Sequence, residues 1–465
     1  MPKTLLPVDP TLTSSGTARA HDPQQLSPWQ SFQSLIALGR IPLASESPLW
    51  TLLGCLISSQ IFPSTTSTTR PTSPFDNLNW WATIQCVLIT WGTNISINYA
   101  NEYFDWDLDR PGQITAITRD IQAKKKIVED EAIREKEGLS LHTKEETEEA
   151  VSEINDKIMS SSCRIIHDGT FPPYTALLCA MFFQLALVVL IIVSRITSPS
   201  NSGAGSDGTS SPFRGLALQI GIFGIILSQS YIGPPLRLHY HGFGEIVSSI
   251  FTSSIATLFG ILGHYTATTG RSVSFPELFS SSSASSSSGF HLDSQMWWFF
   301  LALYTYEQAR IIMMNIPDIE ADKRGNKITL TVRVGQLAAS QLYVLNNLIS
   351  IVSFLFVGAG LVQHQGMLSG SQVLDEGVTK AVSRAWIGGL ISVAAFALPI
   401  MLVVSVSLFH AIKPFKNTGY IPVLPVTELA KVVSIQTLVT PVVLSATVAV
   451  AARAGWAAAS IKGGA

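Results

Sequence analysis

Long blocks of mostly apolar residues alternate with polar segments along this chain of 465 residues. Each block holds roughly the twenty residues that an α-helix needs to cross a bilayer. The pattern therefore predicts an all-α fold, a polytopic membrane protein with nine transmembrane helices. The predicted helices cover residues 36–62, 79–104, 172–195, 213–232, 244–268, 295–316, 340–363, 385–411 and 431–456.

The polar segments divide the chain into a tail, a membrane domain and loops. Residues 1–35 are predicted to be a polar N-terminal tail, and residues 36–460 to be the membrane domain. Within that domain, residues 110–162 form a charged insertion rich in Lys and Glu, whereas residues 198–212 and 280–289 are rich in Ser. Such compositions are typical of solvated or flexible segments, so we expect no catalytic residues in the two Ser-rich loops.

Composition supports a membrane protein and excludes other classes. Hydrophobic residues make up 47% of the chain and charged residues 13%, whereas a soluble chain carries roughly 25% charged residues. The formal net charge is −2 and no basic stripe stands out, so we expect no nucleic-acid partner. The cysteines form no CxxC pair, which favours buried small side chains over a metal or redox site.

Basic residues concentrate in the loops that follow the second, sixth and eighth predicted helices. With nine helices, these loops share one side of the membrane with the N-terminus. The positive-inside rule then places that side in the cytosol or the mitochondrial matrix. A membrane of the endoplasmic reticulum or Golgi and the mitochondrial inner membrane are both compatible with this pattern.

Two acidic clusters stand where apolar blocks end, in the stretches NYANEYFDWDLD and NIPDIEAD. Asn101, Asp105 and Asp109 are spaced four residues apart, and Asp318 and Asp322 repeat that spacing. A helix turns by about 100° per residue, so each cluster can lie on one helix face. Such carboxylates repel one another unless a cation binds, and Mg²⁺ prefers one or two carboxylates plus phosphate oxygens. Two half-sites on facing helices, each with one Mg²⁺, would clamp a diphosphate.

Three other interpretations of these acids are open to test against the sequence. Acids at helix ends can simply cap helices at a wet surface. A calcium-binding EF-hand loop would need Gly and Glu where Arg110 and Ala116 stand, which excludes it. A cation transporter would place its acids near the bilayer midplane, whereas these stand at helix ends. Each half of the chain carries one acidic motif, so a pseudo-repeat remains compatible with transport.

The paired motifs resemble the signature of the UbiA superfamily of intramembrane prenyltransferases. That signature joins an N-x-x-x-D-x-x-x-D motif after the second helix to a D-x-x-x-D motif after the sixth, and this chain has both in that order. The stretches CRIIHDG, YIGPPLRLHYHGFGE and GNKITLTVRVG look like the MenA branch, which prenylates 1,4-dihydroxy-2-naphthoate. The stretch IPDIEADK also resembles the homogentisate prenyltransferases.

The resemblance implies a UbiA-like helix bundle around a central cavity, with two bound Mg²⁺ ions. It implies that the protein transfers an isoprenoid chain from a prenyl diphosphate to an aromatic acceptor like 1,4-dihydroxy-2-naphthoate, in menaquinone or related quinone biosynthesis. A UbiA-like enzyme with another acceptor, such as a homogentisate-like or secondary-metabolite phenol, and a terpene cyclase are the alternatives.

The resemblance also implies roles for individual residues. Metal binding passes to Asn101, Asp105, Asp109, Asp318 and Asp322, and Asn101 is also expected to contact the substrate. The four aspartates and Tyr231 are expected to be catalytic. Pro317 is predicted to kink or end the sixth helix and so to aim the second cluster inward. Substrate contacts are expected from further side chains near the motifs. Those for the diphosphate are Arg164, Lys327, Lys323 and Arg40, and those for the acceptor ring or the carbocation are Arg237 and Tyr231.

Overall fold

The structure is a computed structural model that describes the helical parts of the chain. It covers residues 27–61 except 42, 78–105, 171–198, 210–279, 290–368 except 291, 293, 317 and 325, and 432–446 except 434, 437 and 438. Within these ranges every regular element is a helix and no strand occurs, which confirms the all-α prediction for this part of the chain. The insertion at 110–162 and the Ser-rich loop at 280–289 lie outside the described residues.

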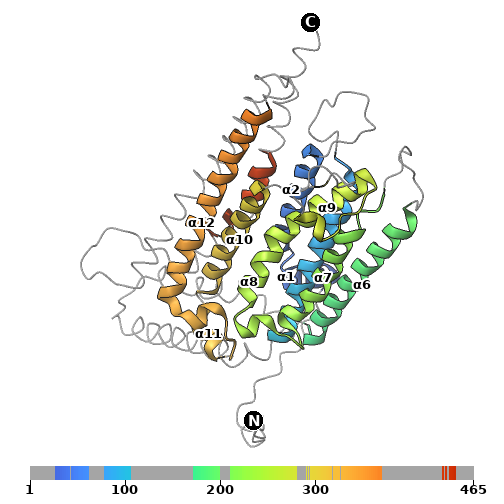
Figure 1. Cartoon of the computed structure of the whole chain (residues 1–465). Helices are drawn as coiled ribbons and strands as arrows, with labels where there is room; N and C mark the ends of the chain where they lie inside the picture. The colour runs from blue at the N-terminus through green and yellow to red at the C-terminus, as the bar shows by residue number, and fades with distance from the viewer. Residues whose placement is uncertain are drawn as a thin grey trace, which may run out of the picture.

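The helices run side by side as an elongated bundle (Figure 1). Their bounds are α1 Pro28–Leu38, α2 Glu46–Ile61, a helix over 80–105, α6 Pro173–Thr197, α7 Gly215–Ile232, α8 Gly244–Ser249, α9 Ala256–Thr269, α10 Ser294–Asn315, α11 Ile319–Arg324 and α12 Leu330–Leu368. A π-helical turn, Ile250–Ile255, joins α8 to α9. Short 3₁₀ turns stand at Leu43–Ser45, Leu238–His241 (η3) and Pro276–Leu278 (η5).

Four helices among the described residues are long and apolar enough to cross a membrane. They are Pro173–Thr197, Gly215–Ile232, Gly244–Thr269 and Leu330–Val357. The first three begin and end within two residues of predicted spans, whereas the fourth begins ten residues before the predicted 340–363. The predicted helix at 385–411 lies outside the described residues, and only part of 431–456 is described. The count of nine transmembrane helices therefore stays a prediction.

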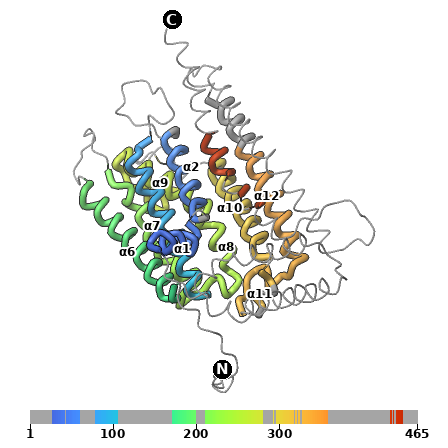
Figure 2. The backbone as a smooth tube through the Cα atoms, turned by 180° about the vertical axis from the view of Figure 1, so that it is seen from behind, coloured from blue at the N-terminus to red at the C-terminus, as the bar shows by residue number. Residues whose placement is uncertain are grey.

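The predicted first span, residues 36–62, is two helices instead of one. The backbone of Arg40 has a φ of 45°, which a right-handed helix cannot include. A Cβ atom on Gly39 would lie 2.6 Å from Cζ of Tyr99, so only glycine allows this close approach. The Tyr99 hydroxyl donates to the Leu35 carbonyl at 2.8 Å, and Asn98 Nδ2 donates to the Gly39 carbonyl at 3.1 Å. These contacts hold α1 across the 80–105 helix (Figure 2).

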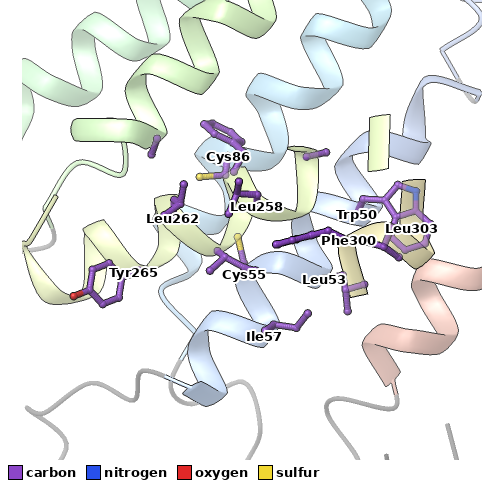
Figure 3. Close-up of a cluster of buried hydrophobic side chains, with 14 of the residues drawn as sticks. Trp50, Leu53, Cys55, Ile57, Cys86, Leu258, Leu262, Tyr265, Phe300 and Leu303 are labelled. Atoms are coloured by element: carbon purple, nitrogen blue, oxygen red, sulfur yellow. The ribbon is translucent and has the colours of Figure 1, made fainter. Parts of the chain in front are cut away.

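The bundle core forms where α2, the 80–105 helix, α9 and α10 meet (Figure 3). Its fully buried side chains include Trp50, Leu53 and Leu303. Among the described helices, α10 packs along α12 and α2 packs along α9. Cys55 and Cys86 are buried free thiols in this core, which confirms for these two the prediction of buried small side chains.

The outer face of α6 is covered by large apolar side chains. Phe182 and Leu185 are about two-thirds exposed, at 66% and 65% of their surface. The inner face carries small residues such as Ala176 and Ala180, which are fully buried. So continuous an apolar surface is unfavourable in water, whereas the acyl chains of a bilayer solvate it. This face is the side of the bundle that a bilayer covers.

Glycines set the distance between α2 and α9. A Cβ on Gly54 would lie 2.1 Å from the Thr257 carbonyl oxygen, and a Cβ on Gly260 would lie 2.2 Å from the Thr51 carbonyl oxygen. Backbones that approach this closely gain van der Waals contact, which drives helix association in lipid. The two glycines therefore decide how far α2 lies from α9.

We expect Gly260→Leu to push α9 off α2 and to lower the free energy of unfolding by at least about 1–3 kcal/mol, the usual range for overpacking. Thermal unfolding of the purified protein in detergent measures the effect. Gly224→Leu on α7 is the matched control, because no atom of the described residues lies within 4 Å of a Cβ at that position. An equal melting temperature for Gly260→Leu and the wild type would contradict the packing argument.

Candidate active site

The first acidic motif ends the 80–105 helix at the lower end of the bundle in Figure 1. Asn101 is half-buried and Asp105 is buried, whereas Asp109 lies outside the described residues. The neighbouring Glu102 is buried as well, and its Oε1 lies 2.7 Å from Nη2 of Arg40. Arg40 therefore sits beside the first motif, through an ion pair that also anchors the turn after α1.

The second acidic motif follows α10. That helix ends at Asn315, directly before the residues that include Pro317, which itself lies outside the described residues. Asp318 is exposed, and its carbonyl accepts a hydrogen bond from the Asp322 backbone N–H at 2.8 Å. Asp322 lies in the short helix α11 and is buried. The two acids are thus one helical turn apart, and Asp322 is the one turned into the bundle.

Lys327 joins the two motifs. Its Nζ lies 3.0 Å from Asp105 Oδ2 and 3.9 Å from Asp322 Oδ1. The chain turns back after α11 because the Lys327 backbone N–H donates to the Asp322 carbonyl at 2.9 Å. Carboxylates from segments more than two hundred residues apart therefore meet at one ammonium group. This is the feature on which the site is built.

The 3₁₀ turn η3 adds an aromatic residue to the first motif. The Tyr240 hydroxyl donates to Asp105 Oδ1. Two cations lie near its ring, with Arg237 Cζ at 5.7 Å and Lys327 Nζ at 5.9 Å from the ring centroid. Both distances fall within the range of cation–π attraction. Tyr240 thus orients Asp105 and helps to position the two cations.

Tyr231 lies at the end of α7, next to η3. Its hydroxyl is 3.0 Å from Nδ1 of His239, and the two rings are 5.1 Å apart between centroids. Burial, and to a lesser extent the positive charge of Lys327, lower the pKa of His239 well below its usual value. A neutral His239 therefore faces the Tyr231 hydroxyl, and Tyr231 lies beside the η3 turn.

Glu245, the second residue of α8, ties three segments together beneath the site. It is fully buried, and its Oε1 accepts hydrogen bonds from Asn315 Nδ2 at 3.1 Å and from the Leu330 backbone N–H at 2.8 Å. The end of α10 and the start of α12 are thereby fixed to α8. Sequence reasoning missed both Glu245 and Tyr240, although both stand in the stretch YIGPPLRLHYHGFGE.

Burial and the neighbouring charges act in opposite directions on the carboxyl group of Asp322. Burial raises the pKa of Asp322 to about 7, and Lys327 opposes this rise while Asp318 and Asp105 add to it. Thr329 Oγ1 donates to Asp322 Oδ2 at 3.3 Å, which also favours the ionised form. A divalent cation would relieve the repulsion among these acids. Within the described residues, no three His, Cys, Asp or Glu side chains form a metal site.

The other predicted contacts lie at different places. Lys323 is exposed on α11, and Arg237 stands before η3 with a φ of 44°. Arg164 lies outside the described residues. The structure thus brings Asp105, Asp322 and Lys327 into direct contact, with Arg237 next to them through Tyr240.

Comparisons with known proteins give only weak likenesses. No protein-family model and no curated protein matches this chain. A UbiA homologue from Archaeoglobus fulgidus bound to GPP and Mg²⁺ has 13% identity and a TM-score of 0.40, over 89% of this chain and 99% of that chain. A digeranylgeranylglyceryl phosphate synthase structure has 12% identity and a TM-score of 0.42, over 91% and 99%. At these TM-scores neither structure establishes the fold or the activity of this chain, and the resemblance to the MenA branch stays a prediction.

We expect Lys327→Met to destabilise the protein by about 3 kcal/mol or more, because breaking a buried ion pair leaves its carboxylates uncompensated. Added Mg²⁺ should recover part of this loss, since a cation between the carboxylates replaces the ammonium charge. Thermal unfolding in EDTA and in Mg²⁺ measures both effects. Lys323→Met, at an exposed position of the same turn, is the control. Equal melting temperatures of the wild type and Lys327→Met in EDTA would refute the bridging role.

Proposed function

We propose that this protein transfers an isoprenoid chain from a prenyl diphosphate to an aromatic acceptor, in a Mg²⁺-dependent reaction within a membrane. The meeting of Asp105 and Asp322 at Lys327 is the observation that supports it most. A diphosphate leaves carbon readily only when cations stabilise the charge that develops on its oxygens. A metal ion held by these carboxylates and the ammonium group of Lys327 would together provide that positive charge.

The donor atoms suit Mg²⁺. This ion prefers oxygen ligands and needs only one or two carboxylates when substrate phosphates supply the rest. The ligands would be Asn101, Asp105, Asp109, Asp318 and Asp322, shared between two ions. Bound Mg²⁺ would neutralise the diphosphate while its bond to carbon breaks.

Basic and aromatic side chains would bind the diphosphate and orient the acceptor. Lys327, Lys323, Arg40 and Arg164 are the proposed contacts of the diphosphate. Tyr240 keeps Asp105 in place through its hydroxyl. Tyr231 and Arg237 both precede the turn that carries Tyr240, and we expect them to orient the aromatic acceptor and to shield the carbocation.

The proposed reaction is an electrophilic aromatic substitution. The bond between C1 of the isoprenoid and the diphosphate oxygen breaks, and its electron pair leaves with the diphosphate. A ring carbon of the acceptor bonds to C1, and the proton on that carbon passes to water. The apolar helices would surround the isoprenoid tail and exclude water from the cation.

We infer that the acceptor resembles 1,4-dihydroxy-2-naphthoate and that the product is a menaquinone-like or other quinone precursor. The stretches CRIIHDG and YIGPPLRLHYHGFGE support this acceptor, whereas IPDIEADK favours a homogentisate-like ring as the second candidate. The distribution of basic residues supports a site that opens to the cytosol or the mitochondrial matrix.

The purified protein in lipid nanodiscs should convert radiolabelled geranylgeranyl diphosphate and a phenolic acceptor into a prenylated product when Mg²⁺ is present. The acceptor panel contains 1,4-dihydroxy-2-naphthoate, homogentisate and simple naphthols. EDTA should abolish the product because the diphosphate then loses its counter-charge. Release of a terpene hydrocarbon without any acceptor product would favour a cyclase. If neither product nor diphosphate is released, the enzyme proposal fails.

Asp105→Asn and Asp322→Asn should each lower turnover by more than about 100-fold, because residues that merely support a metal ligand already contribute about 10- to 100-fold. Both substitutions preserve shape and remove only the charge. Glu277→Gln, the same chemical change at a partly exposed position of η5, should leave turnover unchanged. Full turnover in the double variant would rule out this site.

A further inference from the structure

Exposed tryptophans stand where two helices begin, at the end of the bundle opposite to the candidate site. Trp80 and Trp81 are the first residues of the 80–105 helix, and Trp297 and Trp298 lie near the start of α10. Trp81 exposes 59% of its surface. Tryptophan is enriched where a bilayer meets water, because its ring is apolar and its N–H group is polar. These side chains therefore indicate the level of one boundary of the bilayer.

Other aromatic side chains lie at the same level. The ring of Phe279, directly after η5, stacks on Trp297 with 5.2 Å between centroids, and Phe356 of α12 stacks on Trp298 at 4.8 Å. Phe356 stands directly before Val357, where the apolar span of α12 ends. Three separate segments thus place exposed rings next to one another at the end of the bundle that is far from the carboxylates.

The helix α1 exposes two different sides. Trp29 and Phe32 share one of them, with 64% and 52% of their surfaces exposed and 5.7 Å between their ring centroids. Gln30 and Gln33 are exposed as well, and a turn of about 100° per residue places each at least about 100° away from Phe32. Apolar rings on one side and polar side chains on another are typical of a helix that lies in a membrane surface.

The length of the 80–105 helix relates α1 to the tryptophans. α1 crosses this helix at Tyr99 (Figure 2), whose hydroxyl donates to the Leu35 carbonyl. Tyr99 follows Trp80 by nineteen residues, which corresponds to about 29 Å at about 1.5 Å per residue. The hydrocarbon core of a bilayer is about 30 Å thick. One bilayer core therefore fits between the level of Trp80 and the level of α1.

A second helix gives the same distance independently. Asn315, the last residue of α10, follows Trp297 by eighteen residues, or about 27 Å. The apolar outer face of α6 lies between the two levels, and its exposed Leu185 stands halfway along Pro173–Thr197. The aromatic side chains of α1 therefore border the same lipid-covered face that α6 provides.

We propose that α1 is an interfacial helix whose partner is the phospholipid surface on the side of the candidate site. Trp29 and Phe32 enter the boundary between the lipid headgroups and the acyl chains, and Gln33 faces the headgroups. The tryptophans at the start of the 80–105 helix and of α10 lie at the opposite boundary. Asp105 stands six residues, or about 9 Å, beyond Tyr99, which places it at the level of the headgroups. This inference does not depend on the proposed reaction.

The lipid contact of α1 lies at one end of the helix, and the candidate site lies at its other end. Arg40, in the turn after α1, pairs with Glu102 at 2.7 Å, next to the first acidic motif. Trp29 and Phe32 occupy the first half of α1. The membrane surface and the ion pair would thus together fix the direction of α1 across the bundle.

Nitroxide labels on the full-length protein, in nanodiscs of phosphatidylcholine and phosphatidylglycerol, test the proposal without turnover. Cys163 and Cys179 are replaced by Ala, whereas Cys55 and Cys86 are buried and stay. A label is then attached to one new cysteine at a time. Its accessibility to oxygen, which concentrates in the acyl chains, and to a water-soluble nickel chelate gives its depth in the bilayer.

The labels of Phe32→Cys and Trp81→Cys should lie within about 5–10 Å of the lipid phosphates, the depth of the apolar face of an interfacial helix. Leu185→Cys is the control for the bilayer centre. Gln33→Cys is the matched control on α1, and its label should be more accessible to the nickel chelate than that of Phe32→Cys. All four positions are exposed, so unchanged melting temperatures are expected.

A label at position 32 that is as accessible to the chelate as the label at position 33 would overturn the proposal, because α1 would then lie in water. A label at position 32 as deep as that of Leu185→Cys would overturn it too, because α1 would then lie in the bilayer core. The native Trp29 allows a second measurement without labels. Lipids brominated near the glycerol should quench the fluorescence that is lost in Trp29→Phe more strongly than lipids brominated near the chain end, and equal quenching would contradict the proposal.

Discussion

The ammonium group of Lys327, held between Asp105 and Asp322, is the contact on which the candidate site depends. It joins the end of the 80–105 helix to the turn after α11, and these two segments lie far apart in the sequence. Without a cation at this point, two buried acids would face each other in an apolar bundle, where repulsion is weakly screened. The same demand for positive charge makes the place suitable for a metal ion, whose charge would also balance that of a bound diphosphate.

The rest of the bundle follows the same constraint at greater depth. A charge among apolar helices must be paired. Arg310 and Glu307 pair within α10, and two other ion pairs connect different elements. Arg40 with Glu102 fixes the turn after α1 to the 80–105 helix, and Arg310 with Glu46 connects α10 to α2. Apolar contacts pack α10 against α12 and α2 against α9, and the ion pair of Arg310 with Glu46 connects these two pairs of helices.

The sequence predicts the helices better than it predicts the contacts between them. Hydrophobic blocks place most described helices within a few residues, and four-residue spacing predicts that each acidic cluster shares a helix face. Periodicity predicts which side chains share a helix face, but not which segment that face contacts. It therefore could not reveal that Lys327 bridges two motifs or that Tyr240 binds Asp105. It also missed the break between α1 and α2, because that break depends on the contact of Gly39 with the distant Tyr99. The nine-helix count, and the roles of Asp109 and Arg164, concern residues that the structure does not fully describe.

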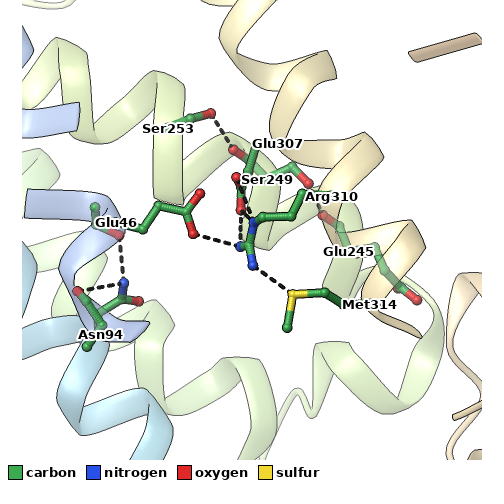
Figure 4. Close-up of polar contacts among 10 residues, drawn as sticks. Glu46, Asn94, Glu245, Ser249, Ser253, Glu307, Arg310 and Met314 are labelled. Atoms are coloured by element: carbon green, nitrogen blue, oxygen red, sulfur yellow. Dashed lines mark hydrogen bonds and ion pairs between the residues drawn. The ribbon is translucent and has the colours of Figure 1, made fainter. Parts of the chain in front are cut away.

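The buried charges of Glu46, Glu307 and Arg310 satisfy the same constraint at greater depth (Figure 4). Arg310 Nη2 lies 3.0 Å from Glu46 Oε2, and Arg310 Nε donates to both oxygens of Glu307 at 2.9 and 3.0 Å. Removing one partner of a buried ion pair is strongly destabilising, because it leaves an uncompensated charge. Arg310 therefore fixes the start of α2 to α10 inside the bundle, whereas the ion pair of Lys327 with Asp105 joins the ends of elements at the candidate site.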